Sequence, residues 1–142
     1  MRRRSIAFVV LALAFVAPRA HAQDLDQVLD RFAASWAKGD AVTIAQLVSR
    51  AGISIDIDGT PIGPLSQRQA TALLRRIFDD RETVVIRAGL AQVVGGAPPR
   101  AFGEIAWSAR SRGTTIPERA TVFLALVRED SGWRITQIRV LR

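Results

Sequence analysis

Residues 118–141, ERATVFLALVREDSGWRITQIRVL, contain two runs of β-forming residues on either side of a turn. The runs cover 118–128 and 133–141 and are rich in valine, isoleucine, leucine and threonine. The sequence EDSG at 129–132 has the composition of a tight turn. The stretch therefore predicts a hairpin of two antiparallel strands.

Two further β-rich runs precede this hairpin, at 82–94 and 101–111. The links between consecutive runs are short and contain glycine, proline and serine, so neighbouring strands are expected to pair antiparallel. Gly89 and Gly103 lie inside these runs, where glycine often marks a bulge or a bend. The C-terminal part of the chain therefore predicts a curved antiparallel meander.

Amphipathic helices are predicted ahead of the meander. The first ends at Gly39 and has Asp24 and Gln27 as a capping box. Asp40 is placed to cap a second, shorter helix that ends near Gly52. Apolar residues at helical spacing are Leu25, Val28, Leu29, Phe32 and Trp36 in the first helix and Ile44, Leu47 and Val48 in the second.

A third helix begins with a capping box formed by Ser66 and Gln69. Its predicted buried stripe is Ala70, Leu73, Leu74, Ile77 and Phe78. Helices followed by strands, with no crossover helix between the strands, indicate an α+β domain whose helices cover one face of the sheet.

A short strand is predicted between the second and third helices. Isoleucines at 53, 55 and 57 alternate with Ser54, Asp56 and Asp58, which is the period of a half-buried strand. Asp58 with the following glycine is a turn signal. By composition, 59–64 and 95–99 are predicted to be turns.

This order of elements resembles the nuclear transport factor 2-like superfamily, an α+β cone. The likeness rests on three N-terminal helices, a short hairpin between the last two, and long antiparallel strands ending in Trp133-Arg134-Ile135. It covers nearly all of 23–142, and Lys38-Gly39-Asp40 also resembles short secreted bacterial domains of unknown function. The resemblance implies a pocket between sheet and helices. The superfamily includes both enzymes and noncatalytic binding or dimerisation domains, so the fold does not select an activity.

Residues 1–22 have the three parts of a signal peptide. Arginines occupy 2–4, an apolar run follows at 6–17, and 20–22 is Ala-His-Ala. We expect cleavage after Ala22, a periplasmic or secreted bacterial protein, and no stable membrane anchor, because the apolar run is short for a span of about 20 residues. The mature chain would then be a single domain, 23–142.

The mature chain has a restricted chemistry. Residues 23–142 contain no Cys, His, Tyr or Met, which excludes histidine-dependent and cysteine-dependent catalysis and the usual zinc sites. Sixteen basic and thirteen acidic residues leave a charge of +3, which argues against a nucleic-acid partner. We expect no cofactor and no metal. Sites that resemble ketosteroid isomerase or scytalone dehydratase need residue types that are missing here.

Asp56 and Asp58 are the candidate catalytic residues. Alternate positions of a strand share one face, so the two carboxylates lie close enough to work as an acid and a base, or to bind calcium. The interpretation we favour places both in solvent, because the neighbouring isoleucines take the core side.

Trp36, Trp107 and Arg139 are the candidate ligand-binding residues. Tryptophans can stack on a ligand, and arginines can bind an acidic ligand in a bidentate way. The favoured interpretation is core packing for Trp36, Trp107 and Trp133, since each has the apolar phase of its element. By strand parity, Glu104 lies on the face opposite to Trp107.

The sequence therefore predicts an exported domain that binds an unidentified small molecule or protein and is not an enzyme. A dimerisation module is considered almost as well supported as a binding domain, because sheets of this superfamily often pair face to face in a homodimer. The enzymatic alternative is a cofactor-free hydrolase or isomerase that uses Asp or Glu carboxylates in the cone pocket.

Overall fold

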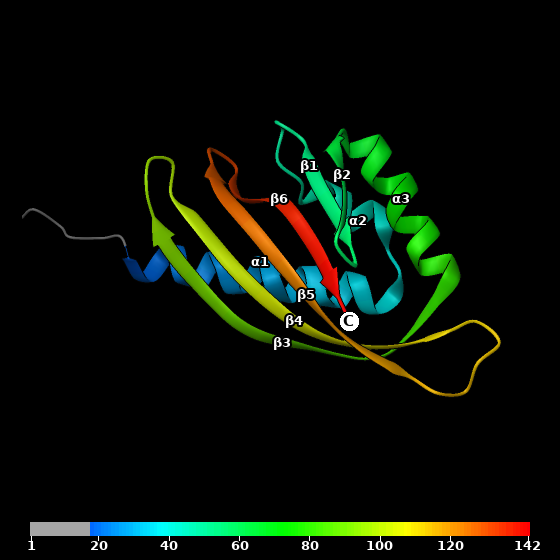
Figure 1. Ribbon diagram of the computed structural model, residues 1–142. Coiled ribbons are helices and arrows are strands. Elements are labelled where there is room, and N and C mark those ends of the chain that lie inside the picture. The colour runs from blue at the N-terminus through cyan, green and yellow to red at the C-terminus, as the bar shows by residue number, and fades with distance from the viewer. Residues whose placement is uncertain (1–17) are drawn as a thin grey trace, which may run out of the picture.

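The computed structural model describes residues 18–142 as helices packed on a curved six-stranded sheet (Figure 1). The helices are α1 (Pro18–Lys38), α2 (Ala41–Gln46) and α3 (Gln67–Asp80), and the strands are β1 (Ile53–Ile57), β2 (Thr60–Leu65), β3 (Arg81–Gly95), β4 (Arg100–Ser111), β5 (Glu118–Glu129) and β6 (Gly132–Leu141). Most of the predicted signal peptide, 1–22, lies outside the described residues, so its cleavage stays a prediction. None of the helices within 18–142 is both long and apolar enough to cross a bilayer.

The strand order is β2-β1-β6-β5-β4-β3. All neighbours pair antiparallel except β1 and β6, which pair in parallel. Each of the four predicted long runs ends within one residue of the observed strand, and the α+β prediction is confirmed. In Figure 1, α1 lies along one face of the long strands, and α3 stands beside β1 and β2.

Three elements differ from the sequence prediction. Helix α2 ends at Gln46 and not near Gly52, because Leu47 caps it and the chain then turns toward β1. The described part of α1 already begins at Pro18, so Asp24 is no N-cap; its carboxylate instead pairs with Arg128 at 3.2 Å. The segment predicted as a turn at 59–64 forms strand β2, which pairs with β1. β2 lies at the edge of the sheet, where Pro61 and Pro64 are tolerated because an edge strand has only one neighbour.

The other predicted caps are confirmed. Ser66 and Gln69 form a complete capping box at the start of α3. Asp40 caps α2, and its side chain accepts hydrogen bonds from the Thr43 amide at 3.0 Å and from the Thr43 hydroxyl at 2.6 Å. The hydroxyl bond, followed by the amide bond, lowers the pKa of Asp40 below its ordinary value.

Asp40→Ala is expected to lower the thermal midpoint at pH 7, because two hydrogen bonds to α2 are lost. The folded pKa of Asp40 is depressed, so its contribution is present above the unfolded pKa of about 4 and disappears as the pH falls through the lower folded value. Melting curves at pH 7 and pH 2.5 should therefore show a difference between variant and parent that shrinks in acid. An equal difference at both pH values would contradict the role of the charged cap.

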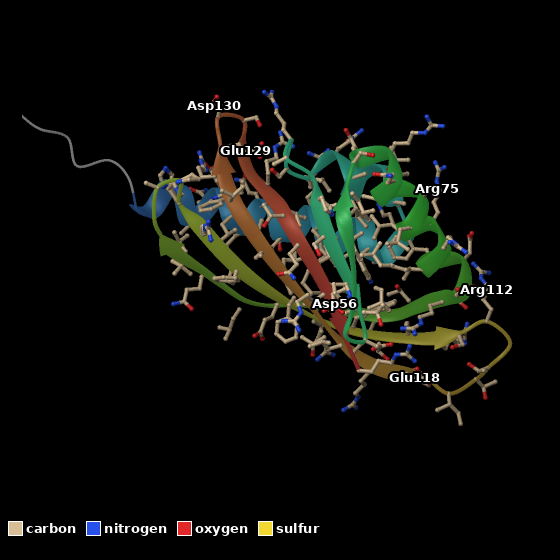
Figure 2. All side chains as sticks on the ribbon, turned by 45° about the horizontal axis from the view of Figure 1, so that its top comes forward. Asp56, Arg75, Arg112, Glu118, Glu129 and Asp130 are labelled. Carbon is tan, nitrogen blue, oxygen red and sulfur yellow. The ribbon has the colours of Figure 1, made fainter. Side chains whose placement is uncertain are left out.

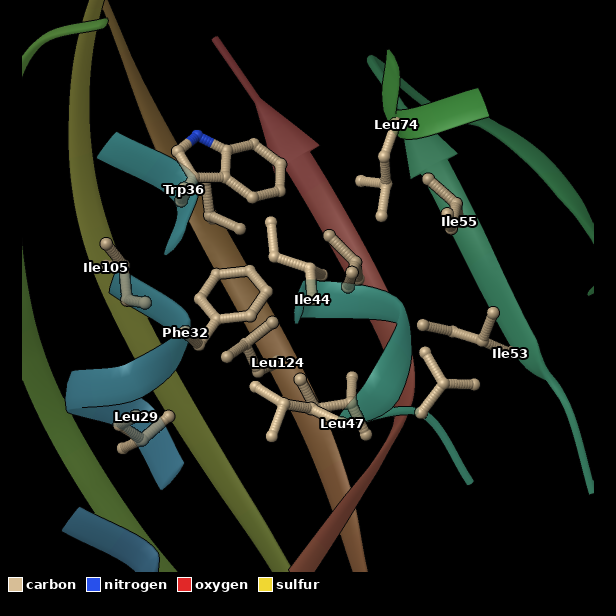
Figure 3. Packing of buried hydrophobic residues seen from close by; sticks show 14 of the residues in the cluster. Leu29, Phe32, Trp36, Ile44, Leu47, Ile53, Ile55, Leu74, Ile105 and Leu124 are labelled. Carbon is tan, nitrogen blue, oxygen red and sulfur yellow. The ribbon is translucent and has the colours of Figure 1, made fainter. Parts of the chain in front are cut away.

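The core lies between the helices and the face of the sheet that they cover (Figure 3). In β4, Ala101, Ile105, Trp107 and Ala109 are buried, whereas Phe102 is exposed. The predicted parity is therefore confirmed: Trp107 faces the helices, and Glu104 faces away. We call the side of β3–β6 turned away from α1 the outer face.

Candidate functional site

Aromatic side chains fill the space between α1, α3 and the sheet. Trp36 is fully buried, and its ring centroid lies 5.3 Å from Phe32, 5.0 Å from Phe78 and 5.2 Å from Trp107. The contacts with Phe78 and Trp107 are edge-to-face, an arrangement that stabilises aromatic pairs. The position where the resemblance implies a pocket is therefore occupied by the protein's own side chains.

The structure places the candidate ligand-binding tryptophans, Trp36 and Trp107, in this core. Trp107 is 2% exposed and donates its indole N–H to the Thr83 hydroxyl at 2.9 Å. The indole nitrogen of Trp36 has no acceptor among the described residues. Trp133 is also buried, so core packing is confirmed for all three tryptophans.

Asp56 does not face solvent, and that expectation is wrong. It is 7% exposed and lies between Pro61 of β2 and Arg139 of β6, its partners in the two strand registers. Its Oδ2 atom is 3.3 Å from Arg139 Nε, while Oδ1 has no hydrogen-bond partner among the described residues. β1 has a neighbour on both sides, and these neighbours cover a side chain that parity alone would place in water.

Asp58 belongs to the turn after β1, as predicted, with a positive φ of 50°. Arg142 donates from Nε to Asp58 Oδ2 at 2.8 Å and lies 3.4 Å from Glu118. The hydrogen bond to Asp58 is the main cause that raises the pKa of Arg142 above its ordinary value. Asp56 and Asp58 are thus bound to different arginines, and the structure does not unite them in one site.

No group of three or more acidic or histidine side chains within residues 18–142 is arranged to hold a metal ion. Among the labelled side chains of Figure 2, Asp56 belongs to β1, next to the edge strand β2, and Glu118 to the start of β5. Calcium binding by Asp56 and Asp58 together has no support from this arrangement.

The outer face carries exposed apolar side chains. Leu90 is 77% exposed, Phe102 is 52% exposed and Val85 is 44% exposed. Phe102 and Leu90 line one hollow with Phe123. The outer face is therefore an unpartnered apolar surface of the kind that marks interaction sites.

Shallow hollows lie at both ends of the outer face. One, of about 570 Å³, is lined by Val85, Ala106, Thr121 and neighbouring residues. The other, of about 630 Å³, is lined by Phe102, Ala125 and residues around them. Small side chains on β4 and β5 make these hollows, and the larger Phe102 and Leu90 stand out beside them.

Charges of both signs share the outer face with these apolar groups. Glu104 is adjacent to Phe123 in the register of β4 and β5, and Arg119 is adjacent to Ser108. Arg87 on β3 is opposite Ala106. Within the described part of the chain, Glu104, Arg87 and Arg119 make no ion pair, so each is available to a partner.

The resemblance implied that sheets can pair face to face, but sequence reasoning did not name the residues of this surface. One signal was present: Phe102 is a large apolar residue at the phase of β4 that also carries Glu104, opposite to the phase of Ile105 and Trp107. An apolar residue at a polar phase is a usable indication of a second contact surface.

Comparisons with known proteins show the fold. No family model matches the chain, and no curated protein matches it. The solved structures similar to it include a proposed aromatic ring hydroxylase from Novosphingobium aromaticivorans, with a TM-score of 0.70 at 12% identity over 88% of this chain and 90% of that one. A proposed dehydratase of the nuclear transport factor 2-like family from Streptomyces avermitilis has a TM-score of 0.66 at 14% sequence identity. The match covers 88% of this chain and 97% of that one.

A third structure, a domain of unknown function with a cystatin-like fold from Nostoc punctiforme, gives a TM-score of 0.68 at 14% identity over 89% of this chain and 79% of that chain. At such identities the likeness concerns the fold and not the activity. The predicted architecture is thereby confirmed: this chain has the nuclear transport factor 2-like α+β fold.

Proposed function

We propose that this chain is an exported, noncatalytic interaction domain whose outer face pairs with a second copy of itself. The observation that carries the proposal is the exposed apolar surface formed by Phe102, Leu90 and Val85 on the sheet face that no helix covers. Export rests on the signal-peptide pattern of residues 1–22.

The shape of the outer face supports a second copy as the occupant. Phe102 and Leu90 protrude from the outer face. Near them lie two hollows, one lined by Ala106 and Thr121 and the other by Ala125. In a two-fold dimer the same patch meets itself, so each protrusion of one copy can enter a hollow of the other. A surface that carries both protrusions and hollows satisfies this requirement.

The charges of the outer face support the same occupant. Glu104 lies on the face that also carries Arg87 and Arg119, and none of the three has an ion-pair partner among residues 18–142. A two-fold operation can set Glu104 of each copy against an arginine of the other, and thereby form the contact twice.

The size of the outer face is sufficient for a stable dimer. β4 and β5 have 12 residues each, and β3 and β6 flank them. Strands of this length span about 40 Å, and four of them cover a width of about 19 Å. The resulting footprint of about 750 Å² is close to the roughly 800 Å² that each partner buries in an interface of standard size.

The enzymatic alternative lacks a carboxylate in the right place. The buried polar or charged residues among 18–142 are Ser35, Ser49 and Asp56, and Asp56 is bound to Arg139 on the outer face. An acid or base in the cone would need to lie among Phe32, Trp36 and Trp107, where the surrounding side chains are apolar. This environment favours the noncatalytic proposal.

The test is the oligomeric state of the protein and of Phe102→Asp. We expect the parent to be a dimer of the 15.5 kDa chain, less any residues removed at export. Phe102→Asp is expected to weaken self-association by about tenfold or more, since a charge would have to be desolvated within the interface. Light scattering coupled to size exclusion, over a concentration series, measures both.

Val42→Asp is the matched control. Val42 is 46% exposed, as Phe102 is 52% exposed, but it belongs to α2 and not to the outer face. The control should remain a dimer. A parent protein that is monomeric at about 100 μM, well above the concentrations at which a specific interface normally holds, would contradict the proposal, and so would a Phe102→Asp variant that associates like the parent.

A further inference from the structure

We infer that a cleft between α1 and the β5–β6 hairpin binds a small organic anion through arginine side chains. The cleft has a volume of about 430 Å³, which suits a small molecule. The cleft opens on the α1 side of the hairpin and shares only Arg128 with a hollow of the outer face, and the inference does not rest on the proposed dimer. The lining of the cleft comes from one face of α1, from the residue that follows α2 and from the β5–β6 hairpin.

The wall on α1 is one face of the helix. Asp24, Val28 and Arg31 are spaced by four and three residues, so their side chains lie one above another. This spacing presents an acidic, an apolar and a basic group in succession toward the hairpin. Leu47, which follows α2, adds a second apolar group.

Two of the cleft's arginines are held in place. Arg128 bonds to Asp24 at 3.2 Å, and its guanidinium lies 5.7 Å from the ring centroid of Trp133. Arg134 donates to the Ser131 hydroxyl at 2.9 and 3.1 Å and to the Gln46 carbonyl at 2.6 Å. These contacts use only part of each guanidinium, so N–H groups remain for a ligand, and their positions are set before it binds.

Arg31 supplies the unpaired charge. Within residues 18–142 it makes no ion pair, whereas the carboxylate of Asp24 is already taken by Arg128. The lining contains three guanidiniums against two carboxylates, Asp24 and Asp130. The cleft therefore has an excess of positive charge in a hollow, which favours an oxyanion.

The apolar part of the lining decides what kind of anion fits. Val28 and Leu47 lie in the same cleft as the arginines, and the buried ring of Trp133 forms part of its wall. A ligand that joins a carboxylate or phosphate to a small apolar body would satisfy both kinds of surface. We assign this class, a small organic oxyanion, to the cleft.

The test compares benzoate and phenyl phosphate with benzamide, which has the shape of benzoate without its charge. Titration calorimetry measures affinity, and the indole N–H signal of Trp133, assigned with Trp133→Phe, reports binding at the cleft by NMR. Arg31→Gln is expected to weaken anion binding by about tenfold, because a charge-assisted bond to the ligand is lost. Binding of either anion supports the inference, and the stronger one identifies the preferred headgroup.

Arg75→Gln is the matched control, since Arg75 is an exposed arginine on α3 (Figure 2) and the substitution removes the same charge. The affinity of Arg75→Gln for each anion should stay within about twofold of that of the parent protein. Three outcomes would each overturn the inference. The first is no binding of either anion at about 10 mM, a concentration that would reveal even a weak specific site. The others are that benzamide binds with the same affinity as benzoate, or that Arg31→Gln and Arg75→Gln lower the anion affinity equally.

Discussion

Trp36→Ala is expected to lower the free energy of unfolding by about 3 to 5 kcal/mol, the usual cost of removing a large buried aromatic side chain. Trp36 is fully buried and contacts the rings of Phe32, Phe78 and Trp107, which come from α1, α3 and β4. Truncation would leave a cavity where three elements meet. Urea denaturation followed by circular dichroism measures the loss.

Trp36→Phe is the companion variant, and its loss should be clearly smaller. Phenylalanine retains most of the ring contacts and removes an indole N–H that has no acceptor among the described residues. A Trp36→Ala protein with the urea midpoint of the parent would show that the rings around Trp36 do not form the core described here.

Arg139→Ala is expected to lower the free energy of unfolding by about 2 to 3 kcal/mol, because a largely buried carboxylate loses its ion-pair partner. The side chain of Asp56 is 9% exposed, and Arg139 is its one ion-pair partner within 18–142. The side chain of Arg139 is 45% exposed, so solvent screens the pair, and we place the loss below that of a fully buried pair.

A double-mutant cycle separates the pair from other contacts of Arg139. Adding Asp56→Asn to Arg139→Ala should recover part of the loss, because the uncompensated charge disappears. Arg75→Ala on α3 should change stability by less than about 0.5 kcal/mol. Additive effects of the Asp56 and Arg139 substitutions would show that the two side chains do not interact in solution.

The elements of the sheet could be predicted because apolar and polar residues alternate along them. The predicted strands 101–111 and 133–141 agree with β4 and β6 to within one residue at each end. The composition of 59–64 predicts a turn because of its prolines and glycines, whereas the resemblance to the superfamily implies a hairpin between the second and third helices. The pairing of β1 with β2 confirms the hairpin. Composition indicates only the conformation that a segment prefers on its own. An edge strand also depends on the hydrogen bonds that it makes with the neighbouring strand.

The sites were harder to predict than the fold. Parity put Asp56 on the correct side of β1, but only the strand order shows that β2 and β6 enclose it. The anion cleft joins Asp24 and Arg128, which are 104 residues apart, so no local pattern could unite them. Contacts of this range depend on the tertiary structure.

The two edges of the sheet are unlike each other, and this limits how copies of the chain can polymerise. A fibre of sheets needs two receptive edges on every copy, one to accept a strand and one to offer the next. The edge at β2 carries Pro61 and Pro64, which cannot donate to a neighbouring strand, while the edge at β3 has 15 residues. Copies joined through β3 have only their proline-bearing edges left. Growth by this route therefore stops at a pair, which disfavours amyloid-like assembly.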